Sequence, residues 1–201
     1  MERISNNSYN SLIQVMEGFF KLSPKFKVVF KSMLYETTYK KGARIVNSGS
    51  KQKVIWFMLD GLAREIRVHN ETFEENTGWF WFSLSFLYTS PGFFNNTSSK
   101  STIEILEDCR VVLISYEDLV ELKKGFGETE LVIERIRGEY DNIRLLYADD
   151  IRNLSTDERY LKHEKTLDIL FGRTQLRFIA EYMGMSPDTL GKLRKKYSGV
   201  R

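Results

Sequence analysis

The sequence of 201 residues contains few of the residue types on which most metal and catalytic sites depend. It has one cysteine, Cys109, and two histidines, His69 and His163, which lie far apart in the chain. Structural zinc sites and iron–sulfur clusters need several thiolate or imidazole ligands, and a disulfide needs two cysteines. We therefore expect no metal and no cofactor. The histidines belong to no nucleophile motif and no phosphate-binding glycine loop is present, so we expect no catalytic residues and no enzyme.

Long hydrophobic runs are also absent. Val54–Leu59 is among the longest, well short of the roughly 20 residues that a membrane-spanning helix needs. The first ten residues are polar and lack the basic start and apolar stretch of a secretory signal. The hydrophobic content of 42% is nevertheless enough for a real core. These features predict a folded cytoplasmic protein with no membrane partner.

Charge is distributed unevenly along the chain. The formal net charge is only +3, too small to indicate a partner by itself. From Arg173 to Arg201, however, seven basic residues stand against two acidic ones, and the preceding residues are slightly acidic in sum. An acidic body with a basic C-terminal segment favours contact of that segment with phosphates. A solvated basic tail is the alternative.

The first half of the chain predicts two short helices followed by a series of short strands. Apolar residues recur at helical spacing from Asn7 to Met33, with a break at Ser23-Pro24. Asp60-Gly61 predicts a tight hairpin turn, because both residue types tolerate a positive φ. About eight strands favour an antiparallel jelly roll, and so an α+β fold class with helices beside a β-roll. The expected strands are Glu36–Lys40, Arg44–Val46, Val54–Leu59, Ala63–Val68, Thr72–Glu75, Trp79–Phe82, Thr102–Leu106 and Val111–Ser115.

After a short helix over Tyr116–Lys124, a long helix is predicted from about Glu128 to Leu154. Its apolar residues alternate at spacings of three and four, as in a coiled coil. This stripe predicts a homodimer, although a helix packed on its own domain would show the same pattern. The expected dimerisation residues are Ile133, Ile136, Tyr140, Ile143 and Tyr147.

The last third of the chain predicts a helix-turn-helix. Ser155-Thr156-Asp157-Glu158 is typical of a capping box, and the helix that it begins is expected to stop at Gly172. Further helices are expected over Gln175–Tyr182 and Pro187–Tyr197, joined by a tight turn at Met183–Met185. Basic residues on the outer face of the last helix favour DNA binding. An ordinary helical hairpin with a basic face is the alternative.

Two segments, Glu158–Tyr160 and Ile179–Leu190, resemble the C-terminal domain of Crp/Fnr-family bacterial regulators. The order of predicted elements resembles that family over nearly the whole chain. The resemblance implies a cyclic-nucleotide-binding-like β-roll sensor domain at 1–127, a dimerisation helix at 128–154 and a helix-turn-helix DNA-binding domain at 155–201. The chain would then be a homodimeric transcription regulator that binds double-stranded DNA.

By that resemblance, the family's base-contacting positions fall on Pro187, Asp188 and Lys192, with Ser186 and Thr189 as phosphate contacts. Asp188 can accept from a cytosine amine and Lys192 can donate to guanine, which are established major-groove pairings. Proline at 187 departs from the arginine often found there, which implies a different target sequence. The other expected DNA contacts are Arg177, Arg194, Lys195 and Lys196.

The segment expected to hold a cyclic nucleotide lacks the arginine that binds the cyclic phosphate in the family. Lys100 is the basic residue there, without the fork geometry of a guanidinium. We therefore do not expect cyclic AMP as the effector. The aromatic run Trp79, Phe80, Trp81 and Phe82 is a candidate site for another small ligand, with plain core packing as the alternative. RNA polymerase and an unidentified small-molecule effector remain candidate partners. The alternative function is a ligand-binding or protein-interaction module whose helical C-terminus does not bind DNA.

Overall fold

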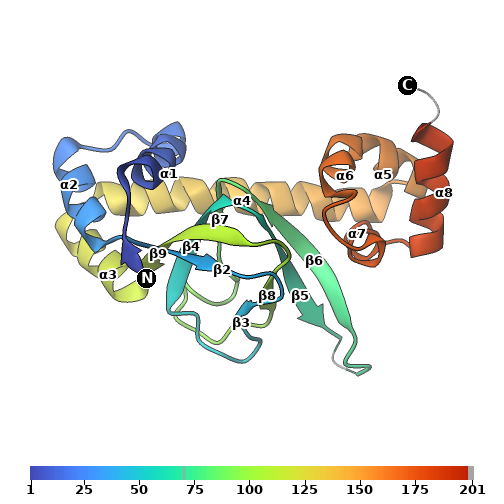
Figure 1. Ribbon diagram of the computed structural model, residues 1–201, viewed down its shortest axis with the longest axis horizontal. Coiled ribbons are helices and arrows are strands. Elements are labelled where there is room, and N and C mark those ends of the chain that lie inside the picture. Colours follow the sequence, from blue (N-terminus) through green and yellow to red (C-terminus); the bar gives the residue numbers. More distant parts are fainter. Residues whose placement is uncertain (70, 199–201) are drawn as a thin grey trace.

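Two antiparallel sheets form a β-roll in the first half of the chain (Figure 1). The computed structural model describes residues 1–69 and 71–198. One sheet has the order β1 (Glu2–Arg3), β2 (Tyr35–Tyr39), β9 (Cys109–Ser115), β4 (Val54–Asp60) and β7 (Ser85–Leu87). The other has the order β3 (Arg44–Val46), β8 (Thr102–Ile105), β5 (Leu62–Val68) and β6 (Glu75–Phe82). The α+β class with an antiparallel roll is thereby confirmed.

The chain turns between β4 and β5 at the predicted position, but the predicted hairpin is wrong, because the two strands lie in different sheets and do not pair with each other. Gly61 has a φ of 118°, and a Cβ there would lie 2.5 Å from Cβ of Cys109. Only glycine fits here, because other residues disfavour this positive φ and because their Cβ would clash with Cys109. The strand expected over Thr72–Glu75 is wrong, because the chain turns there and β6 begins only at Glu75. Phe73 has a φ of 57°, which is incompatible with a strand.

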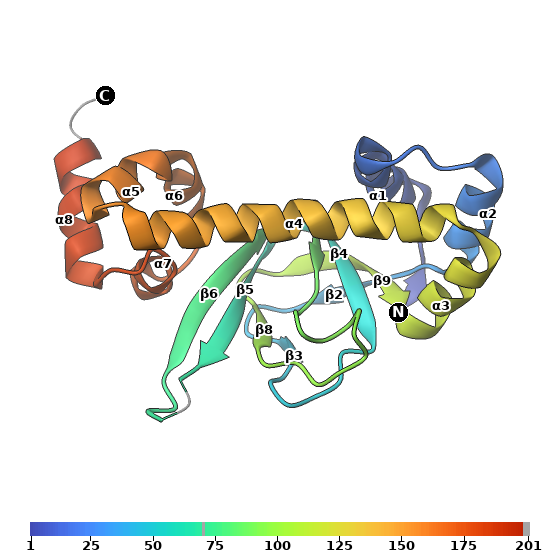
Figure 2. The ribbon, with the colours of Figure 1, turned by 180° about the vertical axis from the view of Figure 1, so that it is seen from behind.

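Three helices cover one end of the roll (Figure 2). They are α1 (Asn6–Phe19), α2 (Pro24–Met33) and α3 (Tyr116–Gly125). Ser23 caps α2 by accepting from the Phe26 amide at 3.2 Å, and Pro24 is the first helical residue, as the sequence predicts. Apolar side chains of these helices share one core with the first sheet.

The long helix α4 (Glu128–Asn153) runs from these helices to the opposite end of the molecule (Figure 2). At about 1.5 Å per residue, its 26 residues span about 39 Å. Within the described residues, no helix is both long and apolar enough to span a membrane.

Four short helices follow α4: α5 (Thr156–Lys162), α6 (Glu164–Leu170), α7 (Leu176–Tyr182) and α8 (Pro187–Ser198). The predicted capping box is present, with Ser155 and Glu158 each accepting from the other's backbone amide. The prediction of a single helix from Ser155 to Gly172 is wrong. The chain leaves the helical conformation at His163 (φ −99°, ψ 11°), which separates α5 from α6. We call α5–α8 the helical domain.

The helical domain packs on the outer face of the second sheet. Leu62, Phe80 and Leu106 of the roll share a core with Ile179 and Tyr182 of α7. The helices predicted to bind DNA therefore belong to a domain that contacts its own β-roll.

Candidate nucleic-acid interface

The turn between α7 and α8 forms for the reasons that the sequence suggests. Gly184 has a φ of 60°, and the Met185 amide donates to the Ala180 carbonyl at 3.0 Å. Ala180 is fully buried, and Ile179 and Leu190 fill the space between the helices. The Thr189 amide donates to Oγ of Ser186 at 3.1 Å, so Ser186 caps α8. The two helices therefore form a tight unit that leaves one side of α8 exposed.

The exposed side of α8 lies at the end of the molecule farthest from α1–α3 (Figure 1). Asp188 and Lys192 are 74% and 76% exposed and form an ion pair of 2.7 Å across one helical turn. The hydrogen bond to Asp188 raises the pKa of the Lys192 ammonium, which is therefore charged at neutral pH. Pro187 is exposed beside them, and Thr189 is half-buried with its hydroxyl 2.9 Å from that of Ser186. The predicted base-contacting residues are thus brought together.

The other predicted DNA contacts differ in their availability. Arg194 is exposed, with its guanidinium over the Phe171 ring at 4.3 Å. Lys196 is paired with Asp157 at the start of α5, which lowers the pKa of that carboxyl. Lys195 is exposed and has no ion-pair partner among the described residues.

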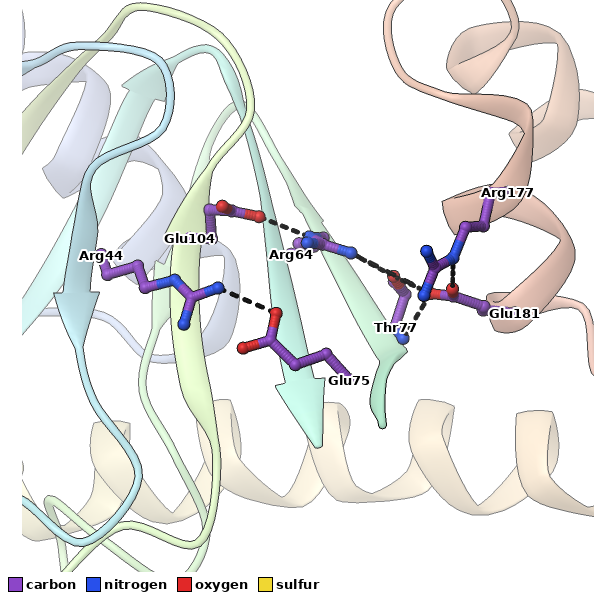
Figure 3. Close-up of polar contacts among 7 residues, drawn as sticks. All are labelled: Arg44, Arg64, Glu75, Thr77, Glu104, Arg177 and Glu181. Atoms are coloured by element: carbon purple, nitrogen blue, oxygen red, sulfur yellow. Dashed lines mark hydrogen bonds and ion pairs between the residues drawn. The ribbon is translucent and has the colours of Figure 1, made fainter. Parts of the chain in front are cut away.

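Arg177 points toward the β-roll. Its Nε donates to Glu181 at 2.7 Å, so the guanidinium is occupied in the free protein (Figure 3). This arginine lies on α7 and pairs with Glu181, which itself accepts from Thr77 of the roll, so it is not part of the exposed face of α8.

These contacts form a polar network between the second sheet and α7 (Figure 3). The Glu181 carboxylate accepts from the amide and the hydroxyl of Thr77, both at 2.9 Å. Arg64 donates to Glu104 at 2.6 Å and to the Thr77 hydroxyl at 3.0 Å, and its guanidinium stacks on the Phe178 ring. We call this set the docking network: Arg64, Thr77, Glu104, Arg177 and Glu181.

An ion pair also joins the same two parts of the molecule. Arg173 donates to both carboxylate oxygens of Glu107 at 2.9 and 2.6 Å, and to the Gly61 carbonyl at 3.2 Å. Sequence analysis missed these roles, because the pairs that join the roll to the helical domain are formed by residues far apart in the chain. The only local signal was the i, i+4 spacing of Arg177 and Glu181.

The aromatic run of β6 and Lys100 do not form one site. Phe80 and Trp81 are buried, and Trp79 and Phe82 pack on the core that includes the helical domain. All four nevertheless line a pocket of about 520 Å³ beside α4. Lys100 is exposed and does not line it.

The predicted dimerisation stripe of α4 is largely used within the chain, which was the alternative interpretation. Ile136 is 6% exposed in the core that α1–α3 share with the first sheet, and Ile133 packs on the same core. The Tyr140 hydroxyl accepts from the Phe86 amide at 2.9 Å. Tyr147 stacks on Tyr182 at 4.5 Å and donates to its carbonyl oxygen. Only Ile143 of the stripe is exposed. The stripe was expected to pack on a second copy of the chain, but it packs on the roll and the helical domain of its own chain.

Within the described residues, no group of three or more histidine, cysteine, aspartate or glutamate side chains is placed to hold a metal ion. Cys109, the first residue of β9, is buried.

No protein-family model matches the sequence, and no curated protein matches it. Solved structures do match the fold. FixK2 from Bradyrhizobium japonicum has a TM-score of 0.72 at 14% identity, covering 83% of this chain and 85% of FixK2. The c-di-GMP-responsive global regulator CLP of Xanthomonas campestris has a TM-score of 0.65 at 18% identity, covering 89% and 93%.

The catabolite activator protein of Thermus thermophilus has a TM-score of 0.50 at 18% identity, covering 90% of this chain and 86% of that protein. These matches extend over the roll, the long helix and the helical domain together. The chain therefore has the fold of these regulators, as its resemblance to the Crp/Fnr family predicts.

Proposed function

We propose that the protein is a homodimeric, sequence-specific DNA-binding regulator of the Crp/Fnr type. The observation that carries this proposal is the exposed face of α8, where Asp188 and Lys192 lie together above a buried helix-turn-helix core. A helix presented in this way enters the major groove, where a carboxylate accepts from cytosine and an ammonium donates to guanine. Lys195 and Arg194 lie farther along α8, suited to the phosphate backbone.

A salt titration of binding to duplex DNA tests the proposal. Affinity should fall steeply with ionic strength, because each neutralised phosphate contributes about 0.9 to the logarithmic slope. Lys195→Ala should lower the slope by about 1 for all sequences, since it removes one phosphate contact. Lys192→Ala should instead relax the preference at one base position, measured by selecting bound duplexes from a random pool. If binding is negligible and does not respond to salt, the alternative function describes the protein better: a ligand-binding or protein-interaction module that does not bind DNA.

The proposed dimer uses a face of α4 other than the predicted stripe. Leu131, Gly138 and Leu145 follow one another at intervals of seven residues, and Leu145 is 62% exposed. Nothing lies within 4 Å of the position that a Cβ of Gly138 would take. A glycine inside a helix costs about 1 kcal/mol relative to alanine, so its presence favours the close approach of another helix. Positions seven apart lie on one side of a two-stranded coiled coil.

Replacing Leu145 by glutamate tests this face. We expect Leu145→Glu to give monomers in light scattering coupled to gel filtration. Val28→Glu is the matched control, because Val28 is also exposed on a helix but lies on α2. A dimer that persists in Leu145→Glu would refute the assigned face. A symmetric dimer predicts a palindromic operator with half-sites about one helical turn, or a multiple of it, apart.

A further inference from the structure

Gly191 lies inside α8, the helix proposed to enter the major groove (Figure 1). Glycine is the poorest helix former after proline, because it loses the most backbone freedom when a helix forms. α8 runs from Pro187 to Ser198, so Gly191 neither caps the helix nor ends it. The reason for a glycine at this position therefore lies outside helix formation.

Packing and backbone conformation do not require the glycine either. At Gly61 a positive φ and the closeness of Cys109 exclude a side chain, and at Gly184 a φ of 60° favours glycine. Gly191 has no such φ. Apart from its two chain neighbours and the backbone of its own helix, no atom of the described residues lies within 4 Å of the position that its Cβ would take. The free protein therefore has room for an alanine there.

The glycine belongs to the side of α8 that carries the expected base contacts. Residues three and four positions apart are neighbours on a helix surface, so Gly191 adjoins Asp188 in one direction and Lys195 in the other. Lys192, paired with Asp188 at 2.7 Å, completes this patch. Leu190 is instead buried in the core of the helical domain. The patch thus consists of three exposed charged side chains around a position that has no side chain.

Gly191 offers a DNA base a contact different from those of its neighbours. Its Cα is a small apolar surface among charged groups. The major-groove edges of the bases carry hydrogen-bond donors and acceptors, together with one projecting apolar group, the C5-methyl of thymine. That methyl has no favourable partner in a carboxylate or an ammonium, but it can pack against a Cα. A side chain at this position would hold the helix farther from the base.

We propose that Gly191 determines specificity by accommodating the methyl group of a thymine next to the base contacts of Asp188 and Lys192. The absence of a side chain lets α8 lie close enough to the base edges for both charged residues to reach them. This role of Gly191 rests on the proposed function and refines it, because it names a further base and the chemical group by which that base is recognised.

Gly191→Ala distinguishes an effect on the fold from an effect on DNA binding. In the free protein alanine improves the helix, so the melting temperature should rise by about 2–4 °C. On a duplex selected from the random pool, the added methyl group meets the thymine, and affinity should fall about tenfold. Gly18→Ala is the matched control, because Gly18 is exposed in α1 and also has open space at its Cβ position. The control should leave DNA affinity unchanged.

Deoxyuridine, which lacks the C5-methyl group, identifies the contact. The thymines of the selected duplex are replaced by deoxyuridine one at a time. For the unsubstituted protein, one replacement should weaken binding about fourfold, because one buried methyl group is lost. For Gly191→Ala, the same replacement should strengthen binding several-fold, because it removes the group that the alanine meets. This reversal at a single position is expected only if residue 191 faces that methyl.

Several outcomes would overturn this role of Gly191. One is a lower melting temperature for Gly191→Ala, since the free protein would then not accept the side chain. Another is an equal loss on the thymine and deoxyuridine duplexes, because the helix would then need close approach without recognising a methyl group. Equal DNA affinity of Gly191→Ala and the unsubstituted protein is a third, and a steep salt response in both would leave the proposed function intact. If the unsubstituted protein shows no salt-dependent binding, the proposed function fails and the role of Gly191 fails with it.

Discussion

Removal of the Glu181 carboxylate is the sharpest test of how the helical domain is held on the roll. The side chain is 11% exposed and accepts two hydrogen bonds from Thr77 and one from Arg177. Arg64 also approaches it at 3.9 Å but keeps its shorter contact of 2.6 Å to Glu104. Glu181→Ala therefore leaves the Thr77 amide as the main unpaired buried group.

The expected cost follows from these contacts. A buried donor that loses its only partner costs about 1–3 kcal/mol, and a hydrogen bond to a charged group contributes about 1.5–3 kcal/mol. Arg177 is largely exposed, so its pair adds only about 0.3–0.5 kcal/mol. Because the terms overlap, we expect a loss of about 2–4 kcal/mol. At roughly 2–4 °C per kcal/mol for a chain of this size, the melting temperature should fall by about 10 °C.

Calorimetry measures the overall effect, and amide hydrogen exchange locates it. Exchange at Thr77 should accelerate in Glu181→Ala, because its amide donates to the carboxylate that is removed. Glu75→Ala is the matched control, since its pair with Arg44 is exposed on the same sheet (Figure 3) and is worth less than about 1 kcal/mol. Equal melting temperatures for the two variants would refute the view that the docking network positions the helical domain.

Three further predictions follow from individual groups. The hydrogen bond from Lys162 lowers the pKa of Asp150, so this carboxylate stabilises the fold above its unfolded-state pKa, and the effect is lost as pH falls through the lower folded value. Asp150→Asn should flatten the acid limb of melting temperature against pH. Burial raises the pKa of the Cys109 thiol to about 11, so a thiol reagent should react slowly at pH 8 until denaturant is added. Asp157→Asn should free Lys196 and steepen the salt dependence of DNA binding by up to about 0.9.

Local sequence signals predicted the elements whose causes are local. The capping box at Ser155 and the turn at Gly61 depend on a few adjacent residues, and both are confirmed, whereas the pairing of the strands on either side of Gly61 was predicted wrongly. The strand expected over Thr72–Glu75 was wrong, because β-branched and aromatic residues favour strands but do not exclude a turn. A local preference cannot determine where two paired strands separate.

The stripe on α4 shows a different limit. Its spacing correctly identified a buried side of the helix, since Ile136 and Tyr140 both contact the chain's own core or backbone. Periodicity specifies which side is covered but not which surface covers it. The docking network has even less local signal, because Thr77 and Glu181 are 104 residues apart. Only the folded arrangement brings such partners together.

The same arrangement changes how the charge of the C-terminal segment should act. In the free protein Lys192, Lys196 and Arg177 are each paired with a carboxylate. Binding to DNA would replace those internal partners with phosphates or base edges, so part of the attraction is offset by the pairs that are broken. The net charge of the segment therefore overstates its affinity for phosphate. The same exchange improves discrimination between base sequences. Asp188 repels phosphate, and this cost is offset only where a base donor faces the carboxylate in the groove.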